Sequence, residues 1–128
     1  MKKLFNYING DFFEPISKNY IKNSSPVDGR VYSLIPDSSQ ADVDLAYVSA
    51  QKAFVDWGQQ TKEFRSEWMM RLADEIDKNA ELLAKSESYD NGKPVWLAQS
   101  MDIPRASANI RFFATAILHF DSKSHDMD

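Results

Sequence analysis

Residues 61–83 read TKEFRSEWMMRLADEIDKNAELL and carry the clearest helical pattern of the chain. Apolar side chains recur at three- and four-residue steps for roughly five turns from Phe64 onward. Thr61 is a residue type that caps helix N-termini, and Glu63 places an acid in the first turn, where the helix dipole favours it. The pattern predicts a helix that begins after Thr61, with Asn79 either breaking it or capping it a second time.

A second helix is predicted before this one, because the apolar period changes after Pro36. Either Ser38 or Ser39 can cap its start. Trp57 is its last apolar residue, and Gly58 is expected to lie past its end.

Further helices are predicted after a tight turn at residues 89–94, where glycine is followed by proline. Residues 94–100 are expected to be helical, and the helix should restart or kink at residues 102–104 because Pro104 cannot donate a backbone hydrogen bond. Its predicted inner face consists of Ala106, Asn109, Ile110, Phe113, Ala116, Ile117 and Phe120.

The first 35 residues show short, two-periodic apolar segments instead. Asn9-Gly10 between two apolar pairs predicts a β-hairpin, because both residues tolerate positive φ. A second turn at residues 25–29 is predicted to separate strands at 19–21 and 31–35. We therefore expect a β-ribbon segment over residues 1–36, a helical layer over 37–120, and a polar tail over 121–128.

Composition narrows the possible functions. The 128 residues include 15 basic and 19 acidic side chains, for a net charge of −4, and neither sign forms a long run, so nucleic acid and membrane surfaces are not expected partners. No export signal or long apolar segment is recognised, and a cytoplasmic protein is expected. The chain has no cysteine, so it contains no thiol nucleophile.

Several short motifs, in their order along the chain, resemble the amino-terminal region of the aldehyde dehydrogenase superfamily. They cover nearly the whole sequence and comprise Tyr7-Ile8-Asn9-Gly10, Ser25-Pro26-Val27-Asp28-Gly29, Asp42-Val43-Asp44, Ala53-Phe54 with Trp57, Arg71-Leu72-Ala73-Asp74, Asp90-Asn91-Gly92-Lys93-Pro94 and Arg111-Phe112-Phe113-Ala114.

The resemblance implies a doubly wound α/β parent fold of which this chain is the amino-terminal β ribbon plus helical layer, mostly α. It implies an oxidoreductase that uses NAD and assembles as a homodimer or homotetramer. The catalytic cysteine, the water-activating glutamate and the oxyanion asparagine of the family have no counterpart in this sequence, and the four glycines are too scattered for a pyrophosphate loop. We therefore expect a truncated fragment that binds no NAD and is inactive alone.

Within the superfamily, residues 101–105 and 109–114 resemble those of 2-aminomuconic and 2-hydroxymuconic semialdehyde dehydrogenases. The resemblance places Arg105 at the mouth of the substrate tunnel, where its guanidinium could bind the carboxylate of a muconic semialdehyde. The alternatives left open are an ordinary solvated arginine and a parent enzyme that acts on betaine aldehyde, succinic semialdehyde or a fatty aldehyde.

Asp90 matches an acidic residue that helps to bind a structural monovalent cation in some family members. The alternative is that Asp90 caps the turn at Gly92-Lys93. His119 and His125 have no partners at metal-ligand spacing, so no metal role is expected of them. A different function class also remains open, in which the chain is a non-catalytic helical interaction or oligomerisation module.

Overall fold

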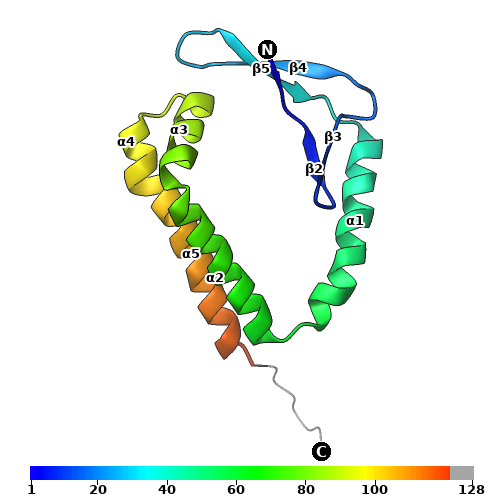
Figure 1. Ribbon diagram of the computed structural model, residues 1–128, viewed down its shortest axis with the longest axis vertical. Helices are drawn as coiled ribbons and strands as arrows, with labels where there is room; N and C mark the ends of the chain where they lie inside the picture. The colour runs from blue at the N-terminus through cyan, green and yellow to red at the C-terminus, as the bar shows by residue number, and fades with distance from the viewer. Residues whose placement is uncertain (122–128) are drawn as a thin grey trace, which may run out of the picture. The chain divides into compact units, whose positions relative to one another are not determined.

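The computed structural model describes residues 1–121 (Figure 1). Within these residues the chain forms two compact units. The first comprises residues 1–59 with 87–93, and the second comprises residues 60–86 with 94–121. The helix that ends at Asn91 contributes residues to both units.

The strands all belong to the first unit and form two small sheets. A three-stranded sheet has the order β1-β5-β4, with β1 parallel and β4 antiparallel to β5, while β2 and β3 form a separate antiparallel hairpin. The strands are β1 (Lys2–Lys3), β2 (Asn6–Ile8), β3 (Asp11–Phe13), β4 (Tyr20–Ser24) and β5 (Val31–Pro36).

Both predicted turns of the ribbon are confirmed. Asn9 and Gly10 connect β2 to β3 with φ values of 54° and 86°, the left-handed region that a two-residue hairpin turn requires. The turn between β4 and β5 closes with a hydrogen bond from the Gly29 N–H to the Ser25 carbonyl, and Gly29 has a φ of 71°. Local turn chemistry therefore determines where the strands reverse.

Helix α1 (Gln40–Gln59) follows β5, and the carbonyl of Ser39, the residue before it, accepts the N–H groups of Asp42 and Val43. The backbone N–H of Ser39 donates to the Asp42 carboxylate over 2.8 Å, which is one half of a capping box. The prediction that Gly58 lies past the end of the helix is wrong. Gly58 is helical, lacks the positive φ of a C-cap glycine, and the helix continues to Gln59.

Apart from Asp42, no residue of α1 is buried within its unit. The exposed large side chains of this helix are Val43, Leu45, Tyr47, Val48, Phe54, Val55 and Trp57. They lie on several sides of the helix, interspersed with polar residues such as Asp44, Lys52 and Asp56. Helix α1 therefore exposes much apolar surface within its unit.

The remaining helices are α2 (Lys62–Lys78), α3 (Ala80–Asn91), α4 (Val95–Leu97), the π-helical turn η1 (Ala98–Asp102), α5 (Ile103–Ala116) and the 3₁₀ turn η2 (Ile117–His119). Thr61 caps α2 as predicted, because its hydroxyl accepts the N–H of Phe64. Asn79 both ends α2 and precedes α3, and its side-chain amide donates to the Glu75 carbonyl.

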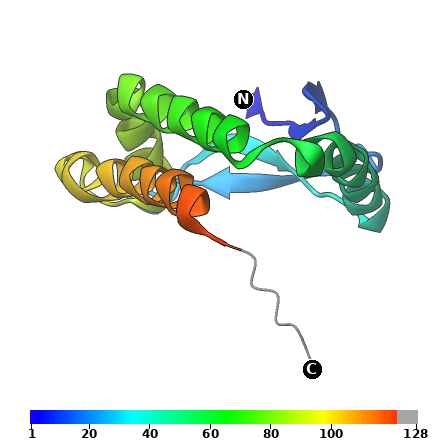
Figure 2. The same cartoon turned by 90° about the horizontal axis from the view of Figure 1, so that it is seen from below.

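Helices α2 and α5 lie side by side in the second unit, as both orientations of the ribbon show (Figures 1 and 2). Small residues are buried on each helix: Ser66 and Ala73 on α2, and Ser107 and Ala114 on α5. Small side chains allow two helix axes to approach closely. This pair forms the main packed element of the unit.

The helix predicted from the apolar period is confirmed as α2, but part of its apolar face, at Phe64, Trp68 and Leu72, is exposed. The apolar arc of α2 is wider than one neighbouring helix can cover. The inner face predicted for α5 is also wrong at Asn109, Phe113, Ala116 and Phe120, which are all exposed. The face that α5 buries is instead centred on Ser107 and Ala114.

Candidate functional site

Arg105, the residue predicted to bind substrate, lies in the first turn of α5 with its side chain exposed. Within residues 1–121, no hydrogen bond or ion pair occupies its guanidinium. The structure thus presents Arg105 as an available cation. Its substrate role stays a prediction.

The backbone immediately before Arg105 is a π-helical turn rather than an ordinary α-helical one. The N–H of Ile103 donates to the carbonyl of Ala98, five residues earlier, and Ala98 is fully buried. Pro104 accounts for the widening, because it has no N–H for the Ser100 carbonyl and its ring would clash with that carbonyl in an α-helix. The predicted change in the helix at residues 102–104 is therefore confirmed as a π turn, after which α5 begins at Ile103.

Arg111, the other arginine of α5, has a very different environment. Its Nη2 atom lies 2.6 Å from Asp77 Oδ2 and 2.8 Å from Asp74 Oδ1, so it links α5 to α2. The nearby Ser107 hydroxyl, and then the Arg111 guanidinium, hold the pKa of Asp77 below its ordinary value. Arg111 therefore joins α5 to α2 through two ion pairs.

Asp90, the candidate cation ligand, lies near the end of α3 within the first unit. Its Oδ1 atom accepts hydrogen bonds from the Tyr32 hydroxyl at 2.5 Å and from the Asn23 amide at 3.1 Å. These two donors, Tyr32 first, lower the pKa of Asp90. The carboxylate therefore ties the end of α3 to strands β4 and β5.

The turn after Asp90 is capped by a different side chain. The N–H of Lys93 donates to Oδ1 of Asn91 over 2.8 Å, so Asn91 provides the cap that was the alternative role for Asp90. Gly92 adopts a φ of 78°, and a Cβ there would approach Pro26 Cγ to 2.9 Å, so only glycine fits. The cation role of Asp90 stays a prediction.

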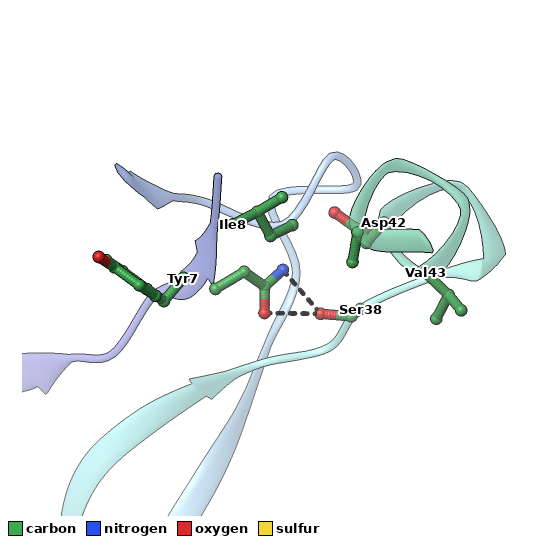
Figure 3. A pocket seen from close by; sticks show the side chains of 7 residues that line it. Tyr7, Ile8, Ser38, Asp42 and Val43 are labelled. Carbon is green, nitrogen blue, oxygen red and sulfur yellow. Dashed lines mark hydrogen bonds between the residues drawn. The ribbon is translucent and has the colours of Figure 1, made fainter. Parts of the chain in front are cut away.

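A cavity of about 290 Å³ lies between the β2–β3 hairpin and the start of α1 (Figure 3). Three polar side chains of its lining, those of Asn6, Ser38 and Asp42, already have hydrogen-bond partners. Asn6 and Ser38 are joined by hydrogen bonds of 2.9 and 3.1 Å, and the Asp42 carboxylate accepts the N–H groups of Ile16 and Ser39. Those backbone donors, Ser39 first, lower the pKa of Asp42. These contacts connect the start of α1 to β2 and to the segment after β3.

Neither a cysteine nucleophile nor a cluster of metal ligands occurs among the described residues. The sequence has no cysteine. Within residues 1–121, no three histidine or acidic side chains are grouped as a metal site would require, and His119 is exposed in η2. His125 lies outside the described residues.

No helix in the described part of the chain combines the length and apolarity of a membrane span.

Some residues that form the contacts described above were not predicted from the sequence. The Ser39-Gln40-Ala41-Asp42 spacing is a capping-box signal and could have identified Asp42. By contrast, Asn23 and Tyr32 are far from Asp90 in sequence, and nothing local connects them to it. Asn109 was predicted on the buried face because the spacing of its apolar neighbours carries no information about which side of the helix is covered.

Comparisons with known proteins agree with this arrangement. The sequence model described as "Aldehyde dehydrogenase family" matches residues 12–128. The chain belongs to the aldehyde dehydrogenase family. Its β ribbon and helical layer correspond to an amino-terminal portion of that α/β fold.

Two curated members of the aldehyde dehydrogenase family show how far the similarity reaches. The chain is 42% identical over 125 residues to the 2-aminomuconic semialdehyde dehydrogenase of Bos taurus. This match covers 98% of the chain and 25% of that protein. It is 40% identical over 112 residues to a long-chain-aldehyde dehydrogenase of Acinetobacter sp, covering 88% of the chain and 22% of the relative. The chain thus spans about a quarter of the length of the curated relatives it matches.

A solved structure of PnpE in complex with nicotinamide adenine dinucleotide has the same fold over this region. The TM-score is 0.94 at 31% identity, and the match covers all of this chain and 26% of that one. NAD use is therefore indicated for the family.

Proposed function

We propose that this chain is the amino-terminal part of an NAD-dependent aldehyde dehydrogenase that oxidises a carboxylate-bearing aldehyde, a muconic semialdehyde, to its carboxylic acid. The observation that carries the substrate class is the exposed guanidinium of Arg105, which has no partner among residues 1–121. A fixed cation next to the aldehyde-binding region would favour substrates with a carboxylate. The similarity to 2-aminomuconic semialdehyde dehydrogenase supports the same choice.

The residues of this chain do not fit the cofactor or the chemistry of the reaction by themselves. Its four glycines, at positions 10, 29, 58 and 92, are too dispersed for a pyrophosphate-binding loop, and it contains no thiol to attack the aldehyde. We therefore propose that NAD and the reacting groups are bound by the remainder of a longer, cytoplasmic polypeptide, and that the parent enzyme is a homodimer or homotetramer.

The isolated chain is expected to be inactive, because the proposal assigns the NAD site and the reacting groups to other parts of the polypeptide. Mixed alone with NAD and a range of aldehydes, the purified chain is expected to form no NADH and to show no NAD binding by calorimetry. Either activity would contradict the proposed role. The reading frame downstream of codon 128 should encode a cysteine nucleophile, a glutamate and a Pro-Trp-Asn stretch, and a continuing frame without them would end the dehydrogenase proposal.

The substrate class is tested in the complete dehydrogenase that carries this chain. Two six-carbon aldehydes are compared, 6-oxohexanoate with a terminal carboxylate and neutral hexanal. Arg105→Ala is expected to lower kcat/KM for 6-oxohexanoate by at least about tenfold, the value of one charge-assisted hydrogen bond, while kcat/KM for hexanal stays unchanged. The matched control is Arg30→Ala, which removes another exposed arginine. Equal losses for both substrates would favour a neutral aldehyde.

A second candidate function rests on the bare surface of α1. Soluble monomers seldom expose large contiguous apolar patches, so the separate chain could act as a helical interaction module that self-associates. Sedimentation equilibrium decides this point. Reversible oligomers would support the module, whereas a monomer with cooperative thermal unfolding would contradict it.

A further inference from the structure

One exposed stripe of α5 combines a cation, an amide and an aromatic ring. Arg105, Asn109 and Phe112 follow one another at steps of four and three residues, so they share a side of the helix. All three are exposed, with 63% of Phe112 accessible. The stripe lies opposite the buried face that is centred on Ser107 and Ala114.

Asn109 is not explained by the stability of the helix. Asparagine is a poor helix former, yet it occupies the middle of α5. Within the described residues its side-chain amide forms no hydrogen bond that would offset this cost. An amide N–H₂ provides two donors, and one helical turn places its Cβ about 6 Å from that of Arg105.

The chemistry of the stripe changes along its length. Its first part offers a guanidinium and amide donors, which together suit a carboxylate. Phe112 presents an apolar ring roughly 10 Å beyond Arg105 and about 4.5 Å beyond Asn109 along the helix axis, at 1.5 Å per residue. The ring of Phe113 meets this ring edge-on, with centroids 5.2 Å apart.

We propose that Arg105 and Asn109 bind the carboxylate end of the aldehyde substrate as a pair, and that Phe112 contacts its carbon chain. This assignment rests on the proposed function and adds Asn109 and Phe112 as residues that determine specificity. Charge complementarity selects the occupant, because a carboxylate with an attached carbon chain satisfies both parts of the stripe. A neutral aldehyde would leave the Arg105–Asn109 pair without a partner.

The test uses the complete dehydrogenase with 6-oxohexanoate and hexanal as probes. Asn109→Asp keeps the shape of the side chain but adds a negative charge, and it should raise KM for 6-oxohexanoate by at least about tenfold without changing KM for hexanal. Asn19→Asp, the same change of amide to carboxylate at an exposed position before β4, is the matched control and should alter neither KM. Phe112→Ala should raise KM for both substrates.

Folding is followed in parallel through Tm. Asn109→Ala should weaken 6-oxohexanoate binding while leaving Tm unchanged or slightly higher, a combination that a purely structural asparagine would not give. If Arg105→Ala discriminates between the substrates but Asn109→Asp does not, the pair is disproved and the proposed function stands. If Arg105→Ala fails to discriminate, the proposed substrate class fails and the pair fails with it.

Discussion

On one face of α5, the guanidinium of Arg111 lies within hydrogen-bonding distance of two carboxylates of α2. On the other face, Arg105 and Asn109 have no partner among residues 1–121. Both arginines belong to the same helix and the same sequence context of small and apolar residues. The difference teaches that the polar groups of α5 divide into those that hold the helix pair and those available to a ligand.

The largest expected effect comes from overfilling the buried face. Ala114→Phe inserts a ring where the alanine is fully buried, and it should lower the free energy of unfolding by about 1–3 kcal/mol. Urea titration followed by circular dichroism measures this loss. The control is Ala108→Phe on the exposed face, which should stay within about 0.5 kcal/mol of the wild type. Equal losses at both positions would remove the distinction between the faces.

A smaller loss of stability is expected when the arginine of the packed face is removed. Arg111→Ala leaves the carboxylates of Asp74 and Asp77 without their shared cation, so Tm should fall. The matched variant Arg105→Ala should not move Tm, because no contact within the described residues is lost. Added salt should narrow the difference between the two variants. An identical Tm for both would show that Arg111 contributes no net stability.

The packed face should also respond to acid. Because the pKa of Asp77 lies below its ordinary value of 3.8 in the folded chain, its carboxylate stabilises the fold above that value. This contribution is lost as the pH falls from about 3.8 toward the lower folded pKa. Urea midpoints measured across this range should decline less steeply for Asp77→Asn than for the wild type. The control Asn109→Ala, which removes no titratable group, should retain the wild-type slope.

The smallest expected effect lies on the exposed face. Asn109→Ala replaces a poor helix former with the best one, and it should raise the free energy of unfolding by a few tenths of a kcal/mol, on the order of 0.5. Precise urea midpoints on the same protein preparation measure it. A clear destabilisation would mean that the Asn109 side chain serves the fold after all.

The sequence predicted the helices and turns of this fold better than it predicted strand pairing and side-chain burial. The Asn9-Gly10 hairpin and the Thr61 cap were predictable because backbone conformation there depends on adjacent residues. The parallel pairing of β1 with β5 was not, because two residues carry no periodic signal and the partner lies about 30 positions away. Family membership was predictable, since its motifs extend along the chain.

The burial of individual side chains could not be predicted from spacing alone. Helical periodicity identified an apolar arc on α2 and another on α5, but it could not say which part of each arc meets a neighbour. The pair packs through small residues such as Ala73 and Ala114, while Phe64 and Phe113 remain exposed. Arg105 was recognised through resemblance, whereas Asn109 required knowing which side of α5 is free.

The π turn before α5 has a consequence for the register of the helix. Closing a backbone ring over five residues instead of four advances the chain by one residue beyond ordinary α-helical winding. Deleting a single residue between Ala98 and Asp102 would restore that winding. Since α5 is held by Arg111, the rotation of about 100° per residue would fall on α4, and Val95–Leu97 would point in a new direction. One residue of length at this turn therefore sets the angular phase between two helical segments.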